Sequence, residues 1–179
     1  VNNAGRSQRS LAVDTDMQTY RDLFELDVFA QIDLTKRVLP IMIAQKSGHI
    51  AVTSSVAGKI GAQLRTGYCA AKHAMQGFFD ALRAEVASEG IHVTSILPGF
   101  VRTEISKNAM RGDGTAFGVV TDNVEAGMDV DAAAGVMAKG LRAKKAEIPV
   151  GTGREMNLLW LKRLAPGLVR RITAKVQAA

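Results

Sequence analysis

The sequence predicts an α/β fold in which a doubly wound, parallel sheet carries helices on its faces. Two runs, residues 48–53 and 91–97, are apolar and rich in β-branched side chains, as buried parallel strands are. Segments with a helical apolar period precede, separate and follow these runs. Strands that alternate with helices predict βα units and therefore a parallel sheet.

The first helical segment spans residues 15–46. Its apolar residues recur at mixed helical spacings, and Pro40 is expected to kink or break the helix before Ser47 and Gly48 close it. After the strand at 48–53, the next residues form a glycine-containing loop up to Arg65. A second helix is expected from about residue 66 to 88. Its apolar stripe consists of Met75, Phe78, Phe79, Leu82 and Val86.

The strand at residues 91–97 is followed by a long segment, 101–128, with four glycines and no clean period. Two interpretations stay open for this segment, a mobile lid over a substrate or an ordinary ordered loop. A helix is expected at residues 130–142, and a short last strand at 146–150.

Residues 154–179 are expected to form a helical tail after the main domain, residues 1–153. Leu168, Ile172 and Val176 repeat at a spacing of four with basic residues between them, which predicts a basic amphipathic helix. In one interpretation this helix packs on the domain and exposes a basic edge. In the other it contacts a membrane surface or a lipid substrate.

The size and composition of the chain exclude several classes of protein. With 179 residues, of which 47% are apolar and 22% charged, it fits one soluble globular domain. No run of about 18 apolar residues is present, so no membrane-spanning helix is expected. The single cysteine, Cys69, fits a reducing compartment and a cytoplasmic location. The three histidines lack ligand spacing, so we expect no metal site.

The positive charge of the chain is concentrated near its C-terminus. The net charge is +6, yet residues 139–179 hold 10 of the 23 basic residues and only 2 of the 17 acidic ones. Aromatic residues are not interleaved with these basic residues as they are in nucleic-acid-binding surfaces. We therefore expect no nucleic-acid partner.

The residues with the clearest chemistry are Tyr68 and Lys72, with Ser55 13 residues before Tyr68. A spacing of four places the tyrosine and the lysine on one face of a helix, about one turn apart. An ammonium beside a phenol favours the phenolate, which suits general acid/base catalysis near neutral pH. By itself the spacing also fits a chance pair on a helix surface.

Further motifs accompany this pair. They are Asn2-Asn3-Ala4-Gly5, Ser54-Ser55, and Pro98-Gly99 followed by Thr103. In this order and spacing, over nearly the whole chain, they resemble the short-chain dehydrogenase/reductase (SDR) family. Residues 67–83 and 108–120 look most like the branch that contains the membrane-associated acyl/alkyl-dihydroxyacetone-phosphate reductase.

The resemblance implies a role for each residue of the site. Tyr68 would exchange a proton with the substrate oxygen, Ser55 would hydrogen-bond that oxygen, and Lys72 would bind the nicotinamide ribose and assist Tyr68. Hydride transfer belongs to the cofactor, NAD or NADP. The residues expected to border this cofactor are Asn2, Ala4, Gly5, Tyr68, Lys72, Pro98, Gly99, Val101 and Thr103.

One site residue departs from the family pattern. The family usually has an asparagine in the helix before the serine strand, where it helps to hold a water in the proton path. Asp27 occupies that place here. It either holds the same water or, if it lies near Lys72, changes the electrostatics of the site.

The resemblance also implies a longer protein. It places residues 1–5 at the end of the family's fourth strand, and the family's glycine-rich phosphate loop, GxxxGxG, is absent from the chain. We expect about 90 residues upstream, at roughly 30 per βα unit. The chain would then be the C-terminal portion of a Rossmann-like domain, inactive by itself. The residues that choose between NAD and NADP would lie upstream, so this choice stays open, with NADP slightly favoured by the resemblance.

The function that the resemblance implies is an NAD(P)(H)-dependent oxidoreductase interconverting a ketone and a secondary alcohol. The lid and the tail favour a bulky or lipid-like substrate. The tail also favours peripheral contact with a membrane. The family packs helix 66–88 and the helix before it against a partner subunit, so a homo-oligomer, dimer or tetramer, is expected. The alternative is a non-catalytic binding or scaffold chain without a complete cofactor site.

Overall fold

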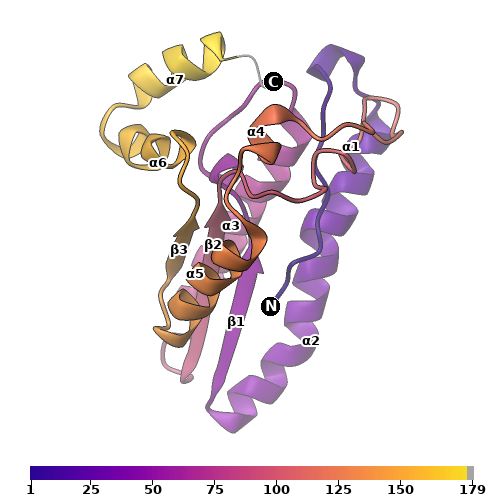
Figure 1. Ribbon diagram of the computed structural model, residues 1–179. Helices are drawn as coiled ribbons and strands as arrows, with labels where there is room; N and C mark the ends of the chain where they lie inside the picture. Colours follow the sequence, from indigo (N-terminus) through magenta and orange to yellow (C-terminus); the bar gives the residue numbers. More distant parts are fainter. Residues whose placement is uncertain (177–179) are drawn as a thin grey trace.

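The computed structural model describes residues 1–176, and its elements alternate as the sequence predicts (Figure 1). The strands are β1 (Gly48–Thr53), β2 (Ile91–Pro98) and β3 (Glu147–Val150), which form one parallel sheet in the order β1-β2-β3. The helices are α1 (Met17–Phe24), α2 (Ala30–Gln45), α3 (Thr66–Glu85), α4 (Asp122–Glu125), α5 (Val130–Arg142), α6 (Glu155–Leu164) and α7 (Pro166–Lys175). Three shorter helices are η1 (Ala12–Asp14), the π-helix η2 (Glu25–Phe29) and η3 (Val56–Gly58). The last residues of the predicted tail, 177–179, lie outside the described residues.

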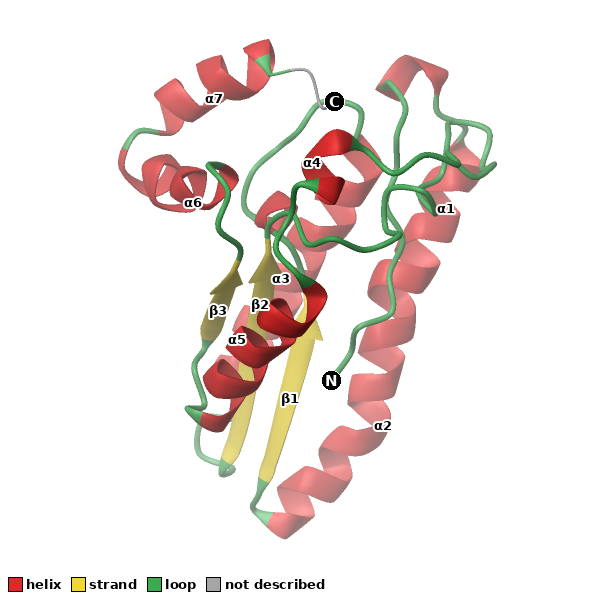
Figure 2. Ribbon diagram, in the orientation of Figure 1, coloured by secondary structure: helices red, strands yellow, loops and turns green. Residues whose placement is uncertain are grey.

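Helices cover both faces of the sheet, with α2 and α3 behind it and α5 in front (Figure 2). Successive strand residues point to opposite faces. Ile50 and Val52 of β1 accordingly pack in one cluster with Phe79 of α3, whereas Ala51 between them packs in another with Ala133 of α5. The predicted α/β fold with a parallel, doubly wound sheet is confirmed.

The beginning of the chain extends the sheet beyond β1. The amide of Asn2 donates to the carbonyl of Ala51 at 2.7 Å, and the amide of Thr53 donates to the carbonyl of Asn2 at 2.8 Å. This parallel pairing places the residues after Asn2 at the same edge as the carboxyl end of β1.

The long helical segment expected for residues 15–46 is present, and Pro40, which was expected to kink or break it, does not break it. Pro40 lies inside α2, which continues to Gln45. Because Pro40 is exposed, the carbonyl that loses its N–H partner can turn to water. The helix ends where Lys46 takes a left-handed conformation, with φ of 54°.

Backbone hydrogen bonds hold the long loop of residues 101–128 at its base and in its middle. At its base the amide of Met128 donates to the carbonyl of Phe100, and the amide of Arg102 donates to the carbonyl of Met128, both at 2.9 Å. In its middle Met110 is buried and pairs with residues 7–9. These contacts favour the ordered-loop interpretation over the mobile lid.

The tail forms two helices, α6 and α7, which pack at the carboxyl-terminal edge of the sheet. Val169 of α7, only 3% exposed, packs against Val56 and Ile60 beside the carboxyl end of β1. Leu168 and Val176, two residues of the predicted apolar stripe, are instead 48% and 58% exposed. The tail therefore packs on the domain with one face and leaves other apolar side chains uncovered.

The exposed apolar residues Leu34, Val38 and Ile41 lie near one side of α2, because they are spaced four and three residues apart. Phe29, just before the helix, is exposed as well. This agrees with the expected subunit interface on this pair of helices, which stays a prediction.

Candidate active site

The carboxyl ends of β1 and β2 and the first turns of α3 bring the three central residues of the site together. Thr53, the last residue of β1, lies in register with Ile96 of β2, so the chain after each strand leaves the sheet at one edge. Ser55 follows β1 directly. Tyr68 and Lys72 lie on the buried side of α3, which confirms that they share a helix face.

Ser55 is fixed from two sides. Its hydroxyl accepts a hydrogen bond from the amide of Ala57 at 3.0 Å, at the start of η3. The same hydroxyl donates to the carbonyl of Pro98 at 3.3 Å. These bonds hold the oxygen at the edge of the sheet, between the ends of β1 and β2.

Tyr68 and Ser55 line the same cavity, which has a volume of about 690 Å³. In the described part of the chain, no side chain or backbone group hydrogen-bonds the Tyr68 hydroxyl. Residues from the tail and from the long loop complete the lining. Its apolar residues include Val56, Ile60, Phe100, Ile105, Leu158 and Ile172, and its charged residues are Arg65, Arg154 and Glu155.

Lys72 lies behind Tyr68, away from the cavity lining. Its ammonium nitrogen is 5.6 Å from the centre of the Tyr68 ring and donates to the carbonyl of Thr53 at 3.2 Å. It also lies 3.3 Å from Oδ2 of Asp27. The side chains of the lysine and the aspartate are 4% and 0% exposed, so this ion pair is buried.

Asp27 is held by its own element and by the start of the chain. It lies on the π-helix η2, and its Oδ1 accepts a hydrogen bond from the amide of Arg6 at 2.8 Å. Its Oδ2 accepts no hydrogen bond from the described residues. Burial raises the pKa of the Asp27 carboxyl, and the charge of Lys72 and the Arg6 amide offset only part of that increase.

The segment Asn2–Gly5 crosses directly over this ion pair. The side-chain amide of Asn2 donates to the hydroxyl of Thr35 at 3.0 Å, and Gln31 donates to the carbonyl of Ala4 at 2.7 Å. A Cβ on Gly5 would lie 3.1 Å from the Lys72 nitrogen and 3.3 Å from Oδ1 of Asp27. Glycine is therefore required there for close approach of the backbone rather than for its φ angle.

The structure separates the predicted site residues into two groups. The cavity is lined by Ser55, Tyr68, Pro98, Gly99 and Val101. The residues that do not line it are Asn2, Ala4, Gly5, Asp27, Lys72 and Thr103. The Thr103 hydroxyl donates to the carbonyl of Val101 at 3.3 Å and is exposed. The roles and the cofactor contacts predicted for both groups stay predictions.

Arg65 is a cavity residue that the sequence interpretation missed. Its guanidinium carbon lies 6.0 Å from the centre of the Phe100 ring, and its Nε has no hydrogen-bond partner among the described residues. Its place three residues before Tyr68, just ahead of the helix, was the signal that could have indicated it.

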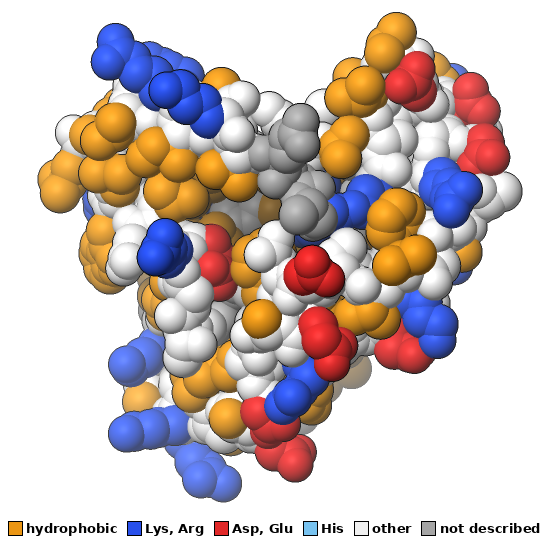
Figure 3. All heavy atoms as spheres, turned by 45° about the horizontal axis from the view of Figure 1, so that its top comes forward, with side chains coloured by type: hydrophobic (Ala, Val, Ile, Leu, Met, Phe, Trp, Pro, Cys, Tyr) orange, Lys and Arg blue, Asp and Glu red, His pale blue; other side chains and the backbone are white. Residues whose placement is uncertain are grey.

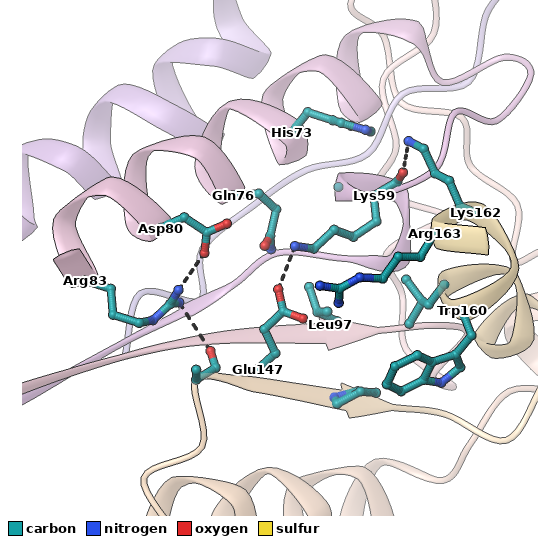
Figure 4. Close-up of a pocket in the computed structure, with 14 residues that line it drawn as sticks. Lys59, His73, Gln76, Asp80, Arg83, Leu97, Glu147, Trp160, Lys162 and Arg163 are labelled. Carbon is teal, nitrogen blue, oxygen red and sulfur yellow. Dashed lines mark hydrogen bonds and ion pairs between the residues drawn. The ribbon is translucent and has the colours of Figure 1, made fainter. Parts of the chain in front are cut away.

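A second hollow, of about 970 Å³, lies between α3, β3 and α6 (Figure 4). Four of its charged side chains form two ion pairs, Lys59 with Glu147 and Arg83 with Asp80, each at 2.6 Å. No predicted site residue lines this hollow, so we do not assign the chemistry to it. Within residues 1–176, no cluster of three or more acidic, histidine or cysteine side chains is placed to hold a metal.

Together, the parallel sheet and the polar residues at the carboxyl ends of its strands define an open α/β fold, a class of protein in which ligands bind at that edge. The sequence model of the short chain dehydrogenases matches residues 1–114. The chain belongs to this family.

Individual relatives agree with this assignment. Dehydrogenase/reductase SDR family member 7B of Danio rerio is 41% identical over 175 residues, which are 97% of this chain and 56% of the relative. The chain thus spans about half the length of the curated relatives that it matches.

Two solved structures share the fold. A Burkholderia phymatum short chain dehydrogenase/reductase in complex with NAD has a TM-score of 0.77 at 19% identity, over 93% of this chain and 65% of that one. A Burkholderia cenocepacia short chain dehydrogenase in complex with NADP has a TM-score of 0.80 at 17% identity, over 98% and 70%.

Proposed function

We propose that the chain carries the acid/base half of an NAD(P)(H)-dependent oxidoreductase that interconverts a ketone and a secondary alcohol. One observation carries the proposal. Ser55 and Tyr68 present their side chains to one cavity, while the Lys72 ammonium lies 5.6 Å behind the Tyr68 ring. Family membership supports it, and the solved structures of this fold in complex with NAD and NADP are consistent with it.

In this mechanism the carbonyl oxygen of the ketone lies between Ser55 and Tyr68. The Ser55 hydroxyl turns from the Pro98 carbonyl to donate to the substrate oxygen, and the Tyr68 hydroxyl gives that oxygen its proton. In the reverse direction, Tyr68 accepts the proton of the alcohol, which the neighbouring Lys72 charge favours. The nicotinamide supplies or accepts the hydride when it is bound.

The donor set fits a nicotinamide nucleotide. An ammonium has three N–H donors, and that of Lys72 bonds the Thr53 carbonyl and forms an ion pair with Asp27, so N–H donors remain for a ribose hydroxyl. Pro98, Gly99 and Val101 line the cavity beside Tyr68, where the nicotinamide end would lie. The contacts of Asn2, Ala4, Gly5 and Thr103 with this cofactor, and NADP over NAD, are parts of the same proposal.

The cavity wall favours a bulky, apolar substrate. Ile105 of the long loop and Leu158 and Ile172 of the tail line the same cavity as Ser55 and Tyr68. A long acyl or alkyl chain would bury apolar surface there, at about 25 cal/mol per Å² removed from water. We therefore assign a lipid-like ketone or alcohol to the cavity, in preference to a small polar one.

This function is tested by incubating the full-length protein with NADPH or NADH and methyl ketones of increasing chain length. We expect cofactor oxidation, with kcat/KM rising as the alkyl chain grows. Binding of lipid-like ketones without any turnover, with either cofactor, would favour the alternative of a non-catalytic binding or scaffold chain. Equal rates for short and long ketones would refute the substrate assignment alone.

We further propose that the tail contacts an anionic membrane surface. Trp160 and Leu164 of α6 are 66% and 85% exposed, and basic side chains gather beside hydrophobic ones over α6 and α7 (Figure 3). No helix in residues 1–176 is long and apolar enough to cross a bilayer. We propose a peripheral contact, through these side chains and the exposed Arg170 and Arg171 of α7.

Vesicle co-sedimentation tests this contact. The full-length protein should bind phosphatidylserine vesicles more tightly than neutral ones, and salt should weaken the binding. Reversing the charges of Arg170 and Arg171 to glutamate should weaken it more than tenfold, because each basic residue near such a surface contributes about 1 kcal/mol. The matched control is Arg37→Glu on α2, whose arginine pairs with Asp33 at the surface. Equal binding to both lipids would leave only the packed-tail interpretation.

A further inference from the structure

The buried pair of Asp27 and Lys72 has a consequence beyond the chemistry proposed above. Lys72 carries the one ammonium beside the Tyr68 ring in the described part of the chain, and Asp27 places an opposite charge 3.3 Å from it. Both side chains are almost completely shielded from water. Their interaction is therefore screened far less than that of a surface pair.

The surroundings hold Asp27 in this position. The π-helix η2 turns residue 27 toward the core, and the Arg6 amide fixes one carboxylate oxygen at 2.8 Å. Gly5 lets the backbone pass against both charged groups. The other carboxylate oxygen faces Lys72 and accepts no hydrogen bond from the described residues. Asp27 thus has a fixed geometry with the lysine as its only close counter-charge in the described structure.

We propose that Asp27 is a positioning residue that holds the Lys72 ammonium and offsets its charge, and so sets the pH range in which Tyr68 exchanges its proton. This inference rests on the proposed function for its link to turnover. It assigns to Asp27 an electrostatic task that an uncharged side chain at the same place would not perform.

The sign of the effect follows from the charges. The ammonium of Lys72 favours the phenolate of Tyr68, and a carboxylate next to the ammonium cancels part of that influence. The charged groups that act on Asp27 are Lys72 from α3 and Arg6 from the start of the chain, and Tyr68 is reached through Lys72. β1 contributes only the Thr53 carbonyl, which bonds Lys72. Removing the Asp27 charge should therefore make Tyr68 give up its proton at a lower pH.

The test is Asp27→Asn in the full-length protein, with alcohol oxidation measured as a function of pH. The rate should rise with pH in both proteins, and its midpoint should lie about one pH unit lower in the variant, a shift of the size that a nearby charge produces. Asp27→Glu, which keeps the charge, should move the midpoint less than Asp27→Asn. Asp33→Asn removes an exposed carboxylate on α2 and is the matched control, with no shift expected.

A second readout does not need turnover. The near-ultraviolet absorbance of tyrosinate is titrated in the wild type and in Asp27→Asn, each against the same protein with Tyr68→Phe, so that only Tyr68 contributes. A lower midpoint in the Asp27→Asn protein supports the proposal even if no ketone is reduced, in which case only the proposed function fails. An unchanged or higher midpoint overturns it, whatever the activity.

Discussion

Replacing Tyr68 with phenylalanine should lower kcat/KM for ketone reduction by about 10²–10⁴-fold, the usual contribution of a general acid/base group. The change removes one hydroxyl that no described residue hydrogen-bonds, and the ring keeps its packing against Ala57 and Cys69. The fold should therefore survive. Steady-state kinetics should show a lower kcat, and thermal unfolding should show an unchanged Tm.

The matched control for this variant is Tyr20→Phe. Tyr20 is the other tyrosine of the chain, and its hydroxyl bonds Thr66 at 2.9 Å near the start of the same helix. Tyr20→Phe removes the same kind of hydroxyl beside Thr66, which lies two residues before Tyr68 on α3. Tyr20 does not line the cavity that contains Ser55. A loss below about tenfold for Tyr68→Phe, or an equal loss for Tyr20→Phe, would contradict the role assigned to Tyr68.

Replacing Lys72 with methionine should lower the free energy of unfolding by about 3–5 kcal/mol, the usual cost of breaking a buried ion pair at one partner. The variant leaves the Asp27 carboxylate buried without its counter-charge. Activity should fall as well, since the ammonium beside Tyr68 is lost. Chemical denaturation of the full-length protein measures the first effect.

The stability of Lys72→Met should also depend on pH. Burial raises the pKa of the Asp27 carboxyl in the folded state, and without Lys72 the largest opposing influence is gone. The folded state then binds a proton that the unfolded state releases, so stability should fall as pH rises above about 4, the ordinary range of an aspartate.

The double variant Asp27→Asn/Lys72→Met is the control for that prediction, because it removes both charges. It should recover much of the lost stability and lose the added pH dependence. If Lys72→Met and the double variant are equally unstable at every pH, the ion pair does not hold this part of the fold.

The sheet and most helices could be predicted from the sequence because their apolar patterns are simple. Residues 48–53 and 91–97 are apolar throughout and became β1 and β2. The helix continues past Pro40, because Pro40 is exposed and the carbonyl that loses its N–H partner can bond water, which sequence spacing does not show. The π-helix η2 could not be predicted, because the apolar residues of the segment 15–46 already recur at mixed spacings, among which one extra residue in a turn does not stand out.

The site was predictable only in part. The spacing of Tyr68 and Lys72 fixes their shared helix face, and the motifs indicate Ser55, but sequence spacing cannot bring Asp27 to Lys72, because they lie on separate helices. The buried face of the tail was also out of reach. On a helix as short as α7, neighbouring stripes through Leu168 or Val169 fit a helical period almost equally well, and the packing partners decide.

The central claim is that a hydride and a proton are exchanged at a carbonyl group held by Ser55 and Tyr68. Its most direct test is to incubate the full-length protein with a long-chain methyl ketone and a nicotinamide cofactor deuterated at the transferring carbon. Mass spectrometry of the alcohol should find one deuterium on the carbinol carbon. The Tyr68→Phe protein should form this deuterated alcohol only at its residual rate. An alcohol without deuterium, or no alcohol with either cofactor, would contradict the claim.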